Sequence, residues 1–158
     1  MLAPLTEIVN KCIQITDRHH LHFKLEGFAP GEQLTGWFDL LRIEQIVRNL
    51  LSNAVKYSET GSAIEVGVRP HRDNLGRAQE VEIWVKDEGI GIAPHYLPHI
   101  FERFYRASSL DTSPVSGFGI GLYLTKQLVK EHEGRIWVES KVDQGSIFFV
   151  VLPLKEVL

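Results

Sequence analysis

The chain has 158 residues, of which 44% are hydrophobic and 23% are charged, and its formal net charge is −3. These values indicate one globular domain over residues 1–158 and exclude a disordered or collagen-like chain. The acidic balance disfavours nucleic-acid binding, which usually needs a basic surface. The apolar runs are too short to cross a bilayer, and the single Cys12 excludes an intrachain disulfide. We therefore expect a cytoplasmic domain without membrane contact of its own.

The first third of the chain mixes helix and strand signals. Apolar residues at helical spacing predict a short amphipathic helix over residues 5–17. A weak alternation predicts a strand at 22–26, and a loop rich in Pro and Gly separates it from a second short strand at 37–38. The strongest helix signal covers residues 40–57, where a wide apolar stripe follows Asp39, a favourable N-cap.

The middle of the chain alternates and then becomes irregular. Period-two alternation predicts strands at 63–68 and 80–86, and the polar residues 70–77 are predicted to link them as a hairpin loop. Further on, a short helix is predicted at 96–104. The Ser, Thr, Asp and Pro residues at 107–116 cannot pack a core and are expected to be mobile.

The last third predicts one helix and one hairpin. A second long helix is expected over 119–132, and strands at 135–140 and 146–152 close the chain. Because the last two strands follow one another, the order favours one antiparallel or mixed sheet with helices on one face.

Four polar residues share one side of the predicted helix 40–57, away from its apolar stripe. Asn49, Asn53, Lys56 and Tyr57 stand at offsets of four, seven and eight residues. A solvated helix face is the simpler explanation. However, asparagine is a mediocre helix former, and its carbonyl oxygen suits Mg²⁺ that also binds phosphates. A lysine one turn on would meet the phosphate charge.

Two glycine motifs follow. Asp-Glu-Gly-Ile-Gly at 87–91 comes at the end of a predicted strand and by itself is usually only a turn. Gly-Phe-Gly-Ile-Gly at 117–121 opens a predicted helix, where backbone N–H groups can approach an anion. The second motif is not a P-loop, since no Gly-Lys-Ser/Thr follows it. It is not a dinucleotide fingerprint either, since that needs Gly-x-Gly-x-x-Gly between a strand and a helix, and this segment follows a long polar loop.

Taken together, five segments resemble the catalytic, ATP-binding domain of sensor histidine kinases. They occur in the family's order: Asn-Leu-Leu-Ser-Asn-Ala-Val-Lys-Tyr (49–57), Asp-Glu-Gly-Ile-Gly (87–91), Phe-Glu-Arg-Phe-Tyr-Arg (101–106), Gly-Phe-Gly-Ile-Gly-Leu (117–122) and Gly-Ser (145–146). The resemblance implies a Bergerat-type α/β two-layer sandwich. In that fold a mixed, largely antiparallel five-stranded sheet carries about three helices on one face. Type II topoisomerases, the 90-kDa heat-shock chaperones and mismatch-repair ATPases share it.

The resemblance also implies ATP and Mg²⁺ as cofactors. Asp87 would accept a hydrogen bond from the adenine amino group, and Asn53 would hold Mg²⁺. Asn49, Lys56 and Arg106 would form the catalytic group, with Arg106 reaching the γ-phosphate. A flexible lid would cover about residues 93–118. The implied nucleotide-binding set is Asn49, Asn53, Lys56, Tyr57, Asp87, Gly89, Gly91, Ile92, Phe104, Gly117, Gly119, Ile120, Gly121, Leu122 and Ser146.

The sequence departs from the family pattern at a few positions. Phe118 stands where a small or hydroxylated residue is more frequent, and Glu133 and Asp143 replace frequent glycines. None of these is an implied site residue, so they bear on affinity more than on activity.

The residues also bear on the kind of reaction. Related ATPases carry a water-activating Glu four residues before the metal-binding Asn, where this chain has Asn49, which cannot act as a general base. Glu44 lies half a helical turn out of phase with Asn53. The dipeptide His132-Glu133 stands at a helix end and is a poor acceptor candidate.

We therefore expect the γ-phosphoryl group to pass to a histidine on a partner dimerisation domain and then to a response regulator. The dimerisation and sensor domains are expected to be absent from this chain. The isolated domain is expected to be monomeric, and the resemblance also allows it to be the cytoplasmic part of a membrane-anchored sensor. Three alternatives remain at this point: a Bergerat-type serine kinase of the anti-sigma kind, an ATPase of the same fold, and a nucleotide-binding module without catalysis.

Overall fold

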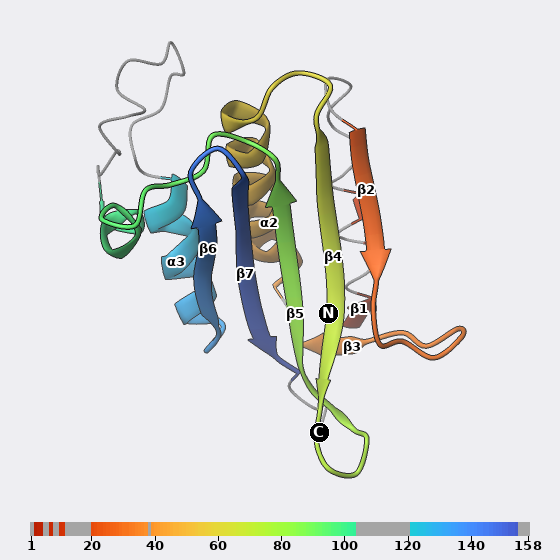
Figure 1. Ribbon diagram of the computed structural model, residues 1–158. Helices are drawn as coiled ribbons and strands as arrows, with labels where there is room; N and C mark the ends of the chain where they lie inside the picture. The colour runs from red at the N-terminus through yellow and green to blue at the C-terminus, as the bar shows by residue number, and fades with distance from the viewer. Residues whose placement is uncertain are drawn as a thin grey trace.

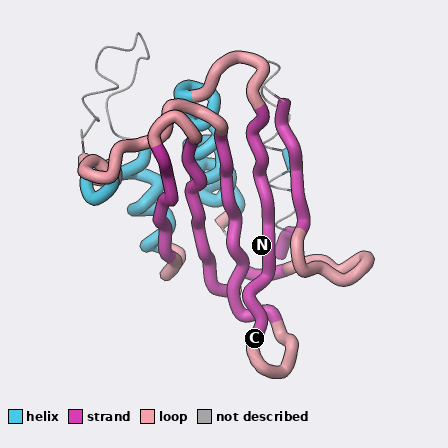
Figure 2. The backbone as a smooth tube through the Cα atoms, viewed as in Figure 1, coloured by secondary structure: helices cyan, strands magenta, loops and turns pink. Residues whose placement is uncertain are grey.

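A computed structural model describes residues 2–4, 7, 10–11, 20–37, 39–103 and 121–154. These residues form two layers, with a β-sheet in one layer and helices packed on one of its faces (Figures 1 and 2). The described helices are α2 (Leu40–Tyr57), α3 (Gly121–Glu131) and the short 3₁₀ helix η1 (Leu97–His99). Within the described ranges, no helix is both long and apolar enough to span a membrane.

The described strands confirm the predicted mixed sheet. Five of them pair in the order β2-β4-β5-β7-β6, in which β2 runs parallel to β4 and every other neighbour is antiparallel. A separate antiparallel pair joins β1 (Leu2–Pro4) to β3 (Thr35–Trp37). The strands of the larger sheet are β2 (His20–Leu25), β4 (Ala63–Arg72), β5 (Ala78–Asp87), β6 (Arg135–Lys141) and β7 (Gly145–Pro153).

The core lies between the sheet and α2. The apolar stripe of α2 is fully buried at Ile43, Ile46 and Leu50, and it faces the inward residues of β4 and β5, such as Ile64 and Ile83. Burying a side chain of this size contributes about 1.5–3 kcal/mol. This stripe therefore fixes the rotation of α2 about its axis, and with it the direction of the helix's polar side.

The start of α2 and its contact with α3 set the relative direction of the two helices. The predicted N-cap is confirmed, since the Asp39 carboxylate accepts the backbone N–H of Arg42 at 3.3 Å. Arg42 also forms an ion pair with Glu131 at the end of α3. Further along, Asn49 bonds to Thr125 near the start of α3. The helices are therefore antiparallel, and the last turns of α2 lie beside the first turn of α3.

Two predictions in the middle of the chain were wrong. The predicted loop 70–77 begins only after Arg72, because β4 continues through Pro70. Proline is tolerated there because β2 ends opposite Val68, so no strand on that side needs the missing N–H. The predicted helix 96–104 is only the turn η1 in its described part.

Several predictions fall outside the described residues. In the predicted first helix, Glu7, Asn10 and Lys11 are helical, and the other positions are not described. Phe38, the segment 107–116 and most of the expected lid also lie outside, as do the predicted site residues Phe104, Arg106, Gly117, Gly119 and Ile120.

Glu133 and Asp143, which replace frequent glycines of the family, both adopt a left-handed backbone. Their φ angles are 59° and 63°, a region that costs residues with a Cβ about 1–2 kcal/mol. Glu133 follows α3, where its N–H bonds to the carbonyl of Lys130 and the Gly134 N–H bonds to that of Val129. This is the Schellman arrangement, in which glycine is preferred at the position of Glu133.

Replacing Glu133 with glycine should raise the free energy of unfolding by about 0.5–1 kcal/mol. The relief of left-handed strain exceeds the freedom that glycine adds to the unfolded chain. Urea unfolding measures the difference. Glu133→Ala is the matched control, because it removes the same side chain and keeps the Cβ. An equal gain in the alanine variant would show that the backbone angle is not the cause.

Candidate functional site

Asp87 is a buried carboxylate at the last residue of β5. It stands on the core face of the strand, in phase with Ile83 and Val85, and only 6% of it is exposed. Its Oδ1 accepts the backbone N–H of Gly89 at 2.9 Å. Burial raises the pKa of Asp87, and hydrogen bonds from the backbone N–H groups of Gly89 and Ser146 partly offset this rise. A carboxylate bonded in this way keeps further acceptor positions for a ligand.

The glycine loop after Asp87 packs tightly against two other elements. A Cβ added to Gly89 would lie 2.1 Å from the carbonyl oxygen of Tyr57, the last residue of α2. Gly91 has a φ of +70°, and its Cβ would lie 2.0 Å from the Lys141 carbonyl oxygen at the end of β6. The Ile90 N–H also bonds to the Tyr57 carbonyl at 3.1 Å. Larger residues at either glycine would push the loop away from α2 or β6.

Two serines tie the other end of this loop to the sheet. The Ile92 N–H donates to the hydroxyl of Ser140 at 2.8 Å, and that hydroxyl lies 2.7 Å from the hydroxyl of Ser146. Ser146 was predicted from the sequence, and in the sheet register it stands directly opposite Asp87. Ser140 was missed. The sequence pattern could have indicated it, because Ser140 is a polar residue in phase with Ile136 and Val138, on the face of β6 that points to the core.

The polar side of α2 meets the start of α3. Asn49 is half-buried, and its amide donates to the hydroxyl of Thr125 at 3.2 Å. Asn53 is half-buried and Lys56 is exposed. Among the described residues, the side chains of Asn53 and Lys56 make no hydrogen bond or ion pair. These two polar groups are therefore available to a ligand.

The side chains of this region could bind magnesium only together with water and phosphate oxygens. Across the described ranges, no group of three or more His, Cys, Asp or Glu side chains could hold a metal ion. Mg²⁺ commonly takes one or two protein oxygens and completes its shell with water and phosphate oxygens. The unpartnered carboxamide of Asn53 can supply such an oxygen, so the residues present fit a magnesium ion that arrives with a phosphate ligand.

The predicted site residues that are described gather at one end of the molecule. The end of α2, the loop after β5 and the turn between β6 and β7 all lie at the upper end in Figure 1. Tyr57, Asp87, Gly89, Gly91, Ile92 and Ser146 are brought together by the contacts given above. Gly121 and Leu122 begin α3, which lies beside the last turns of α2.

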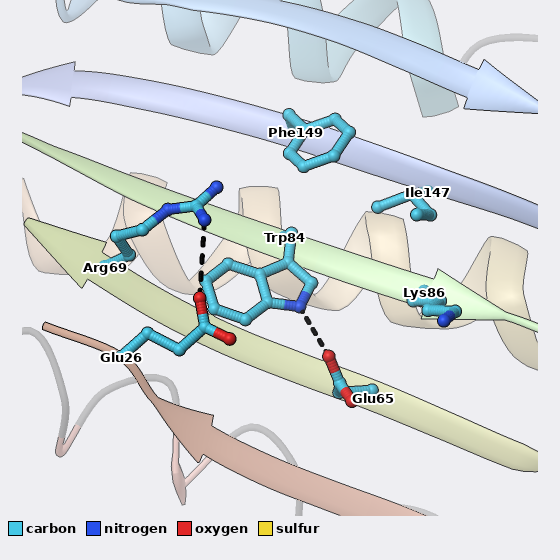
Figure 3. A pocket seen from close by; sticks show the side chains of 7 residues that line it. All are labelled: Glu26, Glu65, Arg69, Trp84, Lys86, Ile147 and Phe149. Carbon is cyan, nitrogen blue, oxygen red and sulfur yellow. Dashed lines mark hydrogen bonds and ion pairs between the residues drawn. The ribbon is translucent and has the colours of Figure 1, made fainter. Parts of the chain in front are cut away.

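A hollow of about 240 Å³ lies on the opposite face of the sheet, which carries no described helix (Figure 3). Trp84 lines it, and its Nε1–H donates to Glu65 at 2.8 Å. Strand alternation places Trp84 on the face opposite Ile83 and Val85. The sheet therefore separates this hollow from the residues around Asp87. Its lining is Glu26, Glu65, Arg69, Trp84, Lys86, Ile147 and Phe149.

The site thus belongs to a two-layer α/β domain in which a buried aspartate and a glycine loop meet the polar end of a long helix. Residues 38–156 match the family described as Histidine kinase-, DNA gyrase B-, and HSP90-like ATPase. The chain belongs to this family. The match includes every described site residue named above.

Individual relatives agree with this assignment. The chain is 34% identical over 143 residues to the sensor protein kinase WalK of Staphylococcus saprophyticus, covering 89% of this chain and 23% of WalK. It is 32% identical to the sensor histidine kinase RppB of Synechocystis, covering 84% of this chain and 28% of RppB. The chain spans about a quarter of the length of these relatives.

Solved structures share the fold. The mycobacterial sensor histidine kinase MprB aligns with a TM-score of 0.75 at 24% identity, covering 99% of both chains. The catalytic domain of the histidine kinase ThkA aligns with a TM-score of 0.79 at 21% identity, covering 99% of this chain and 98% of that one. The fold is therefore that of histidine kinase catalytic domains, as the sequence predicted.

The buried state of Asp87 predicts a pH-dependent stability. Its pKa in the folded protein is raised above the ordinary 3.8, so the protonated carboxyl favours folding more than the charged one does. This contribution to the free energy of unfolding is lost as the pH rises through the raised pKa. Asp87→Asn removes the titration and keeps an oxygen for the Gly89 N–H. The variant should therefore gain stability relative to the wild type as the pH increases.

Urea unfolding of both proteins between about pH 4 and pH 8 measures this difference, in which the other titrating groups cancel. A difference that stays constant over this range, or that shrinks with increasing pH, would contradict the burial of an ionising carboxyl at this position.

Proposed function

We propose that this chain binds ATP with Mg²⁺ and donates the γ-phosphoryl group to a histidine on a partner dimerisation domain, within a two-component signalling system. The observation that carries the proposal is the buried Asp87 carboxylate, held by Gly89 at the end of a strand. A buried acceptor at this place selects the amino group of adenine. Guanine would present a carbonyl there and leave two acceptors facing each other.

The phosphates would lie between α2 and α3. Because the helices are antiparallel, the N-terminus of α3 lies beside the turns of α2 that carry Asn53 and Lys56. A helix N-terminus offers free N–H groups and a positive dipole end to an anion. Asn53 would hold Mg²⁺, and Lys56 would neutralise phosphate charge. Arg106 is proposed to reach the γ-phosphate from its position outside the described residues.

Transfer to a histidine, rather than to water, is supported by the side chains of α2. Asn49 stands where a water-activating carboxylate would be needed, and its amide is bonded to Thr125. The Glu44 carboxylate accepts from Arg48 at 2.9 Å and is out of phase with Asn53 on the helix. An efficient hydrolase needs a general base close to the attacking water.

The names of the relatives support the wider setting. WalK and RppB are named as a sensor protein kinase and a sensor histidine kinase, and the chain matches only about a quarter of each. We therefore place the acceptor histidine and the sensor on parts of a protein that this chain does not contain. The partners in this proposal are the dimerisation domain and a response regulator, and the domain works in the cytoplasm as a monomer.

Asp87→Asn should weaken ATP binding about 10- to 100-fold, because the Asn oxygen stays on the Gly89 N–H and its amino group then faces the adenine amino group. Isothermal titration with ATP and Mg²⁺ measures the loss. Titration with GTP is the matched control: GTP should bind weakly to the wild type and should not bind more weakly to the variant, because the Asn amino group can donate to the guanine carbonyl. Unchanged ATP affinity in the variant would remove Asp87 from the adenine site.

The reaction type is tested by following ³²P from γ-labelled ATP. The chain alone should bind ATP and release almost no phosphate. Added to a purified dimerisation domain of a sensor histidine kinase, it should transfer label that is stable to alkali and lost in acid, as a phosphohistidine is.

Each alternative has its own outcome in this assay. Steady release of phosphate by the chain alone would indicate an ATPase. Acid-stable label on an added protein would indicate a serine kinase. Binding with neither release nor transfer would indicate a nucleotide-binding module without catalysis.

A further inference from the structure

Thr125 is a buried polar residue that is not among the residues proposed to bind ATP. It lies on the inner stripe of α3 with Leu128 and Val129, and its exposure is 0%. A hydroxyl buried without partners costs about 1–3 kcal/mol, so such groups are normally bonded. The Thr125 hydroxyl makes two hydrogen bonds, and one of them leads directly to the polar side of α2.

The two bonds fix which atom of Asn49 faces Thr125. The Thr125 hydroxyl has one hydrogen, which it donates to the carbonyl oxygen of Gly121 at 2.7 Å. Towards Asn49 it can therefore only accept, and it does so from the amide Nδ2 at 3.2 Å. The amide cannot be reversed without placing two acceptors together. Its carbonyl Oδ1 is thus directed away from Thr125 and has no partner among the described residues.

We propose that Thr125 is a positioning residue that holds the Asn49 carbonyl oxygen towards the magnesium–phosphate group of the bound nucleotide. The proposal rests on the function proposed above. Asn49 lies one helical turn before Asn53 on the same side of α2, so both carboxamides face the same ligand. Asn49 would act there as an acceptor for a water of the metal shell, which Mg²⁺ usually retains.

The same bonds connect this oxygen to the start of α3. The Gly121 carbonyl that accepts from Thr125 belongs to the first residue of the helix. A shift of that first turn would move the hydroxyl and release the Asn49 amide. Binding of the magnesium form of the nucleotide is therefore coupled to the position of the α3 N-terminus through Thr125.

The test compares Thr125→Val with Thr125→Ser in the whole chain. Valine keeps the volume and removes the hydroxyl, and serine keeps the hydroxyl. Affinity for ATP is measured by titration with Mg²⁺ and again with EDTA. Thr125→Val should weaken ATP binding about tenfold with Mg²⁺ and less than about twofold with EDTA, and Thr125→Ser should match the wild type.

Other outcomes overturn the proposal. An equal loss with and without Mg²⁺, or an equal loss in the serine variant, would show a packing role only. An unchanged valine variant would show no role. Should the valine variant fail to fold, Thr125→Ala is measured in its place with the same expectation.

A double-variant cycle identifies the partner. With Asn49→Ala already present, removing the Thr125 hydroxyl should have no further effect on magnesium-dependent binding, because the amide that it orients is gone. Additive losses would show that Thr125 acts through another group. If the wild-type chain binds no ATP under either condition, the proposed function itself fails. If it binds and the valine variant binds equally, only the role of Thr125 fails.

Discussion

The approach of one glycine loop to two backbone carbonyls is the constraint on which the site depends. Gly89 lies against the Tyr57 carbonyl of α2, and Gly91 lies against the Lys141 carbonyl of β6. These contacts leave no room for side chains, so the loop can close over the end of the sheet only with glycine at both positions. Strand alternation places the carboxylate of Asp87 beside this loop on the core face of β5, where it can accept hydrogen bonds and is shielded from solvent. Burial of this group destabilises its charged form, a cost that functional sites often carry.

The antiparallel contact of α2 and α3 adds the second half of the site. Two interactions join the helices at different heights along their length: the ion pair of Arg42 with Glu131 and the hydrogen bond of Asn49 with Thr125. The polar end of α2 and the N-terminus of α3 therefore face one region. Hydrophobic packing could place α2 beside α3 at several heights, whereas the Asn49–Thr125 bond selects one of them, because at any other height the Asn49 amide would lose this acceptor.

Much of the fold could be predicted because its elements carry strong local patterns. The helix 40–57 has both a wide apolar stripe and an N-cap, and its predicted bounds agree with α2. The strands from 63 and from 80 onwards alternate clearly, although β4 runs past Pro70 because its neighbour β2 has already ended. That extension depends on strand pairing, which local pattern does not contain. The short helix predicted at 96–104 was wrong in its described part, because a few apolar residues there do not distinguish a 3₁₀ turn from an α-helix.

The sequence by itself determined the class of fold, the family and the residue types at the site, because box motifs and periodicity are local properties of the chain. Only the tertiary structure decided which polar groups meet. Ser140 and Thr125 each stand in an apolar stripe, and the residues near them in the sequence do not indicate that Ile92 and Asn49 are their hydrogen-bond partners. Ser140 is hydrogen-bonded to the Ile92 N–H and to the Ser146 hydroxyl. Thr125 is hydrogen-bonded to Asn49, which is 76 residues away. Hydrogen bonds are short and directional, so partners that are distant in the chain become apparent only when packing has brought their strands and helices together.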